Sequence, residues 1–285
     1  MEFYQKTVVD IQPTIPVTLY HYCSTDKLHY LLAPGCDLNC RYLTCQGDKE
    51  EYRFGAKLLC DFIRQQGPRY SAVGGRMESV LVDNIGCAGE RMIDPRIPLT
   101  FSLTERIDSE YHYQEQEYCR NGGCAIAFNQ QRLDCACDGV VRHGVSLRLV
   151  RCYYEGKDTA EITALCEAFW LDQVQNIERL IKSNYCDEES GRAILIEICS
   201  IAPHFKRKKF DADNEWRIVM VSRECDKVNG EGFRASGLRD NTLHCDLINL
   251  MEGVAVRRCA EKADTMRELS RFALQQRNNS FKVWV

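Results

Sequence analysis

The sequence lacks any apolar run of about 20 residues, the length that a membrane-spanning helix requires. It also lacks a Pro- or Ser-rich linker, an internal repeat and a low-complexity segment, so residues 1–285 predict a single elaborated domain. Residues 1–6 do not show the charged and then apolar pattern of a signal peptide. We therefore expect a cytoplasmic protein that has no membrane partner.

An excess of positive charge is missing as well. The chain carries 37 Lys and Arg against 41 Asp and Glu, a formal net charge of −4. No net positive field is available to hold a nucleic-acid backbone, although the run Lys206-Arg207-Lys208-Lys209 is a local exception. Because the sequence also lacks an Asp/Glu/His cluster with metal-binding spacing, a nuclease is not the expected function.

Cysteine is abundant, but its pattern is not that of a disulfide scaffold. The chain has 17 cysteines, an odd number, and several lie inside apolar segments, as Cys60, Cys152, Cys166 and Cys199 do. Two groups suggest zinc ligands, but neither contains paired C-x-x-C knuckles: Cys36, Cys40 and Cys45, and then Cys119, Cys124, Cys135 and Cys137. We expect reduced thiols and no bound metal.

Hydrophobic spacing predicts a mixture of strands and helices. Strands are expected at residues 17–23, 99–104, 124–128, 145–154, 215–221 and 281–285, and helices at 50–64, 159–183, 188–201 and 263–276. Residues 71–98 read as irregular, Asp158 to Glu161 as a capping box, and Glu252-Gly253 as a hairpin turn. The predicted fold is α+β, with a bent, mostly antiparallel sheet, flanking helices and a helical insertion at about 157–205.

Glu215 and Arg217 are the strongest candidates for a site. They stand at the start of the apolar run 218–221, which is typical of a strand covered on both faces. Charged residues at such a position must either form an ion pair or face a cavity. Both readings stay open at this point, because two residues on the same side of a strand can also pair with each other.

Short segments of the chain resemble a known family in their order and spacing. Residues 19–24, 47–55, 101–104, 123–129 and 214–217 are similar to the uncharacterised bacterial family catalogued as domain of unknown function 2971. The chain departs from that family at residues 46–49, where Asn-Asp-Pro is usual, and at Tyr113, where Trp is usual. More distantly, His21, Ser102 and Glu215 resemble the His-Tyr/Ser-Glu triad of ADP-ribosyltransferases.

The resemblance implies an ADP-ribosyltransferase-like split sheet that binds NAD as its substrate. Glu215 would hold the ribose and stabilise its oxocarbenium-like transition state, and His21 would hydrogen-bond a ribose hydroxyl. The remaining residues of the implied NAD site, which stack on nicotinamide or orient the substrate, are Tyr22, Tyr113, Ser102, Thr104 and Arg217. Such a protein would be a transferase or NAD glycohydrolase, acting as a bacterial toxin or anti-phage defence effector that modifies a macromolecular acceptor or consumes NAD, with a restraining partner protein.

A second hypothesis comes from another class of protein. His21 on an apolar strand is compatible with a satisfied core histidine, and Glu215 with an ion pair to Arg217. The chain would then be a non-catalytic nucleotide-sensing or protein-interaction module, in which the helix at 159–183 presents a face for assembly, including assembly into a homo-oligomer.

Overall fold

The structure of this protein is a computed structural model. It describes residues 17–24, 27–28, 31, 38–39, 41–42, 50–83, 98–105, 119, 123–138, 145–222, 242–243, 250–257, 267, 269, 271 and 282–284. The helices are α2 (Glu50–Gln65), α3 (Pro68–Glu78), α5 (Gln130–Asp138), α6 (Thr159–Lys182) and α7 (Glu188–Ile201). Shorter helical turns are η2 (Ser79–Asp83), η3 (Ala202–His204) and η4 (Lys208–Asp213).

Most of the strands form one sheet. It contains β1 (Thr18–Ser24), β3 (Arg41–Tyr42), β4 (Leu99–Thr104), β5 (Gly123–Asn129), β6 (Val145–Arg151), β9 (Glu215–Ser222), β11 (Met251–Arg257) and β12 (Lys282–Trp284). Two small pairs stand apart, namely β2 (Leu38–Asn39) with β10 (Thr242–Leu243) and β7 (Tyr153–Tyr154) with β8 (Phe205–Lys206). The sheet order is β12-β11-β5-β1-β4-β9-β6, with β3 beside β4, and only β11 and β12 pair in parallel among the described strands of this sheet. The predicted mostly antiparallel sheet with flanking helices is confirmed.

The sheet is joined weakly at its middle. Both β1 and β4 are described over their whole lengths, and Tyr20 opposite Thr104 is the single residue pair between them. The start of β4 instead pairs with β3, through Thr100 and Leu99. One edge of β4 is therefore shared by two strands, and we call the place where β1 and β4 part the seam.

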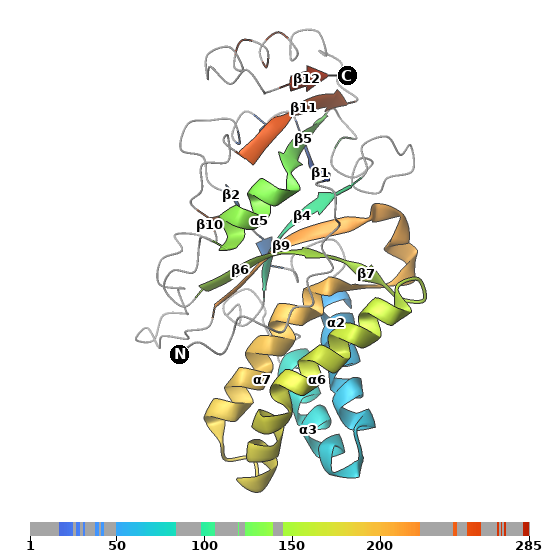
Figure 1. Cartoon of the computed structure of the whole chain (residues 1–285), viewed down its shortest axis with the longest axis vertical. Helices are drawn as coiled ribbons and strands as arrows, with labels where there is room; N and C mark the ends of the chain where they lie inside the picture. Colours follow the sequence, from blue (N-terminus) through green and yellow to red (C-terminus); the bar gives the residue numbers. More distant parts are fainter. Residues whose placement is uncertain are drawn as a thin grey trace.

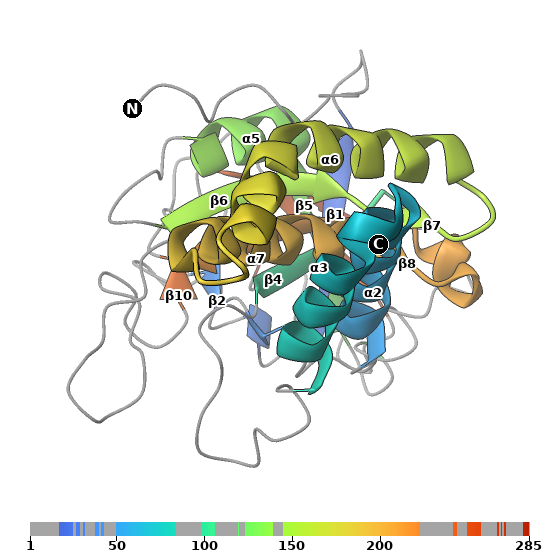
Figure 2. The ribbon, with the colours of Figure 1, turned by 90° about the horizontal axis from the view of Figure 1, so that it is seen from below.

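The two larger hydrophobic cores among the described residues lie on opposite faces of the sheet. One contains the side chains of Phe101, Ile126 and Ile218 together with Leu133 of α5. The other packs α2, α3, α6 and α7 against Val219 and its neighbours on β6 and β9. Figure 1 shows these four helices gathered at one end of the molecule, and Figure 2 shows them from below, in front of the strands.

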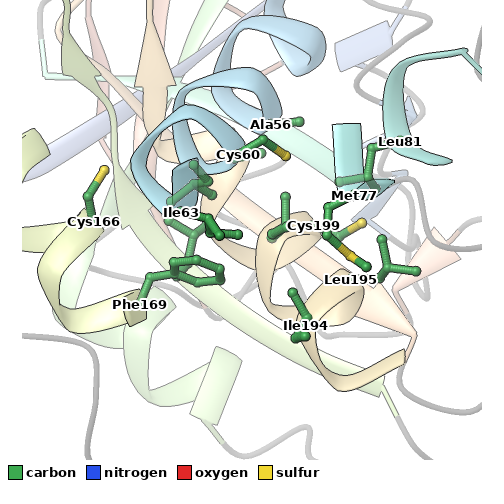
Figure 3. Close-up of a cluster of buried hydrophobic side chains, with 14 of the residues drawn as sticks. Ala56, Cys60, Ile63, Met77, Leu81, Cys166, Phe169, Ile194, Leu195 and Cys199 are labelled. Atoms are coloured by element: carbon green, nitrogen blue, oxygen red, sulfur yellow. The ribbon is translucent and has the colours of Figure 1, made fainter. Parts of the chain in front are cut away.

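The helical layer is built from two separate segments of the chain. The expected insertion at 157–205 supplies α6 and α7, and the earlier segment supplies α2 and α3. Figure 3 shows how they meet, with Cys60 and Ile63 of α2 near Phe169 of α6 and Cys199 of α7. The cysteines behave as small hydrophobic residues here, since both are 0% exposed.

The expectation of irregular structure at residues 71–98 is wrong for its first part, which forms α3 and the π-helical turn η2. Gly74 and Gly75 suggested a break in helical structure, but Gly74 lies where α3 contacts α2 closely. A Cβ at Gly74 would lie 2.6 Å from the backbone oxygen of Cys60, so the absence of a side chain lets α3 lie against α2. Pro68 begins α3 at a position where a helix tolerates proline.

Two further expectations differ from the structure. Glu252 and Gly253 lie inside β11, at a bulge opposite β5, and do not form a hairpin turn. Asp158 precedes α6 without capping it, because its carboxylate accepts a hydrogen bond from the backbone N–H of Tyr154. Helix α5 was not expected, and its first turn is held by Asn129, whose side chain accepts from the N–H of Arg132. Within the described segments, no helix combines the length and apolar character needed to cross a membrane.

Candidate functional site

Arg217 lies at the centre of a network of buried charges. Its Nε donates to Oε1 of Glu215 at 2.6 Å, and one terminal nitrogen donates to Oε1 of Glu51 at 2.7 Å. The other terminal nitrogen donates to the backbone oxygen of Pro203 at 2.9 Å. The guanidinium thus connects β9 to helix α2 and to the turn η3.

Lys206 is the second cation of the network. Its Nζ donates to Oε2 of Glu215, to Oδ2 of Asp213 at 3.3 Å, and lies 3.5 Å from Oε1 of Glu51. The same ammonium sits 4.8 Å from the ring centre of Phe210. We call Glu51, Lys206, Asp213, Glu215 and Arg217 the charged cluster.

Every member of the charged cluster is buried. The exposed fractions run from 1% for Arg217 to 5% for Glu51. Burial by itself raises the pKa of the Glu215 carboxyl, but the neighbouring Arg217 and Lys206 outweigh it and hold that pKa at about 2. Burial lowers the pKa of Lys206, yet Glu215 and Glu51 raise it above its usual range, so both groups stay charged.

The local backbone fixes Glu215 in this position. Asn214 takes a left-handed conformation, with φ of 39°, and turns the chain from η4 into β9. The N–H of Glu215 donates to the hydroxyl of Tyr154 at 2.7 Å, and its backbone oxygen accepts from the N–H of Cys152 at 2.9 Å. On the helical side, Gly55 permits the close approach of α2, since a Cβ there would lie 2.2 Å from the oxygen of Ala202.

Strand register divides the predicted NAD site between two faces of the sheet. Thr104 lies opposite both Glu215 and Tyr20, and Ser102 lies opposite Arg217. Directly opposed residues in antiparallel strands share a face. Ser102, Thr104, Glu215 and Arg217 therefore lie on the face that carries the four-helix layer.

Tyr22 follows the same alternation, two residues beyond Tyr20, and packs with Cys119, Ala125 and Ala255. His21 points to the opposite face, where its ring stacks on Phe101 with centroids 4.0 Å apart. Its Nδ1 lies 2.9 Å from the backbone oxygen of Ser102, so the imidazole bridges the seam between β1 and β4. Tyr113 lies outside the described residues.

Glu51, Lys206 and Asp213 were not among the predicted site residues. Glu51 did carry a signal, because it stands four and eight residues before Gly55 and Leu59 on the buried stripe of α2. A charge on such a stripe needs a buried partner. Lys206 gave no comparable signal, because the run of four bases that contains it reads as a solvated patch.

The charged cluster can hold together the elements that carry it. Both carboxylate oxygens of Glu215 already accept a hydrogen bond from a cation. Among the residues that the structure describes, no three His, Cys, Asp or Glu side chains are arranged to hold a metal ion.

Comparisons of the chain with protein-family models, with curated proteins and with solved structures found no match.

Proposed function

We propose that this chain is a non-catalytic, nucleotide-sensing module that binds NAD or a related nucleotide at the seam, and that Glu215 has a structural role. The observation that carries the proposal is the state of the Glu215 carboxylate. It is 3% exposed and each of its oxygens accepts from a buried cation.

Catalysis by Glu215 would require a large rearrangement. The carboxylate must reach the ribose of NAD and stay there as charge develops on the sugar. To do so it would have to leave Arg217 and Lys206, and the two cations would then remain buried without their main counter-ion. Uncompensated buried charge costs about 3–5 kcal/mol, which disfavours such an opening.

The seam supplies groups suited to a nucleotide. Tyr20 and Ser102 are half-buried on the helical face of the seam and His21 is half-buried on the opposite face, in contrast to the fully buried cluster. His21, held by a backbone oxygen, is oriented to hydrogen-bond a ribose hydroxyl on its own face of the seam, and the Tyr20 ring offers a stacking surface on the other face. These features support binding of a nucleotide at the seam.

ADP-ribosyl transfer or NAD hydrolysis is the second candidate, and one observation favours it. Tyr20, Thr104 and Glu215 form a row across three strands at the seam, where the sheet divides into two halves. In that function the chain would act as a toxin or defence effector on a macromolecular acceptor, and a partner protein would restrain it.

A titration with NAD separates the two candidates. Calorimetry measures binding, and chromatography of the same mixture measures free nicotinamide. We expect binding without nicotinamide release, partial loss of affinity in His21→Gln and greater loss in His21→Ala. Glu167→Gln, an exposed change on α6, is the control.

Nicotinamide release by the wild type that disappears in a folded Glu215→Gln variant would establish the transferase instead. Absence of both binding and release in the wild type would contradict the nucleotide-sensing proposal.

A further inference from the structure

Two cysteines face each other across the ladder that joins β1 to β5. Cys23 lies directly opposite Cys124 in the antiparallel register, and both belong to the same hydrophobic core. Both are present as thiols. Opposed residues of this kind have Cα atoms about 4.5–5.5 Å apart, which lies inside the range of about 4.4–6.8 Å spanned by disulfides.

A third thiol lies close to the pair but on the other side of the sheet. Cys119 Sγ is 3.9 Å from the backbone oxygen of Cys23 and 4.0 Å from that of Cys124. It packs with Tyr22 and Ala125, which alternate with Cys23 and Cys124 along their strands and so face the opposite way. The register therefore selects Cys23 and Cys124 as partners and leaves Cys119 beside them.

We propose that Cys23 and Cys124 are a modification site, which a low-molecular-weight disulfide such as oxidised glutathione converts into a cross-strand disulfide. One cysteine thiolate attacks a sulfur of the small disulfide and forms a mixed disulfide, and one glutathione thiolate leaves. The second cysteine thiolate then attacks the cysteine sulfur of the mixed disulfide and displaces the second glutathione thiolate. The two protons lost by the cysteines are taken up by the two released thiolates, so the pair is oxidised and the small disulfide is reduced.

Burial sets the rate of this reaction. Cys23 is 1% exposed and Cys124 is 0% exposed, and burial together with the neighbouring thiols raises the pKa of Cys23 above its usual range. Thiolate formation therefore waits for the end of β1 to open. The exposed Cys135 and Cys186 react with the same reagent first, without requiring any opening.

The bond would tie down the strand that carries the seam. It links β1, three residues beyond the Tyr20–Thr104 pair, to β5 in the half of the sheet that contains β11 and β12. It also closes a loop of about 100 residues, which removes freedom from the unfolded chain. Oxidation is thus expected to raise the melting temperature by about 5–15 °C.

The test is disulfide mapping of the chain of residues 1–285. The folded protein is incubated with oxidised glutathione, at 25 °C and again about 10 °C below its melting temperature. Remaining thiols are then alkylated, and the digest is analysed by mass spectrometry. We expect one peptide pair that links Cys23 to Cys124, and a raised melting temperature that a reductant reverses.

Cys23→Ser and Cys124→Ser should each lose the cross-link and the rise in melting temperature. Cys135→Ser, the matched change at an exposed thiol, should keep both. A cross-link from Cys23 or Cys124 to any other cysteine would overturn the proposal. The absence of any cross-link at both temperatures would overturn it as well, and this outcome is read on the wild type, so it does not depend on the folding of a variant.

Discussion

Arg217 makes three hydrogen bonds from a side chain that is almost wholly buried, and each goes to a different part of the structure: its own strand, helix α2 and the turn η3. A guanidinium can do this because its donors diverge in a rigid plane. An ammonium concentrates its charge at one atom and cannot reach the three acceptors together.

Arg217→Lys is therefore not a conservative change in this protein. We expect the free energy of unfolding to fall by about 3 kcal/mol, because buried acceptors and Glu51 lose their donor. Urea unfolding measures the difference. Arg192→Lys, at an exposed position of α7, is the control, and equal stability of the two variants would contradict the role given to Arg217.

His204 is expected to make the fold sensitive to mild acid. The side chain is 5% exposed, and within the described part of the chain its Nδ1 has no hydrogen-bond partner. Burial first, and then the charges of Arg148 and Arg217, lower its pKa from 6.5 to about 3. As the pH falls below about 6.5 the unfolded chain binds a proton that the folded chain does not, so stability declines with falling pH from there toward 3.

Urea unfolding at pH 7 and pH 5 tests this linkage. The wild type should lose about 2 kcal/mol more stability than His204→Gln over that interval, since one pKa unit corresponds to about 1.4 kcal/mol. Parallel losses in the two proteins would show that other groups cause the acid sensitivity.

Some contacts of single residues could be predicted from the sequence, and others could not. The pairing of Glu215 with Arg217 followed from their spacing on one strand, and it was one of the two readings left open. The separation of His21 from Ser102 and Thr104 did not follow, because it depends on which residue of β4 lies opposite Tyr20. Alternation fixes faces within a strand, whereas the register between distant strands is a property of the folded chain.

At the scale of elements, periodicity predicted α2, α6 and α7 because each has a clear apolar stripe. Helix α3 was missed because Gly74 and Gly75 resemble a break, and glycine spacing does not reveal a neighbouring helix. The sequence also could not predict that β1 and β3 pair with the same edge of β4, since pairing of strands far apart in sequence leaves no local pattern.

The two glycines of α3 are expected to respond in opposite directions. Gly74→Ala should destabilise the protein by about 1–3 kcal/mol, because its Cβ would press on the backbone of Cys60. Gly75→Ala should be neutral or stabilising by up to about 1 kcal/mol, because its Cβ would meet only the end of the Arg64 side chain, at 3.8 Å. Thermal unfolding of both variants measures this, and a stabilising Gly74→Ala would contradict the packing of α3 on α2.

At the scale of the whole molecule, the charged cluster connects the sheet to the helical layer. Glu51 comes from α2, Lys206 from β8, Asp213 from η4, and Glu215 and Arg217 from β9. Four elements from two regions of the sequence, residue 51 and residues 206–217, therefore meet at one set of compensated charges. Removing one charge from such a set costs free energy, because it leaves the opposite charge buried without a partner. The charged cluster is therefore better suited to hold the two layers together than to supply a mobile catalytic group.

The free energy of unfolding of Glu215→Gln, measured in urea beside the wild type and Glu167→Gln, is the most direct test of this role. Glutamine keeps the shape of the side chain but leaves Arg217 and Lys206 without their main counter-ion. We expect a loss of about 3–5 kcal/mol in Glu215→Gln and almost none in Glu167→Gln. Wild-type stability in Glu215→Gln would contradict the structural role of Glu215.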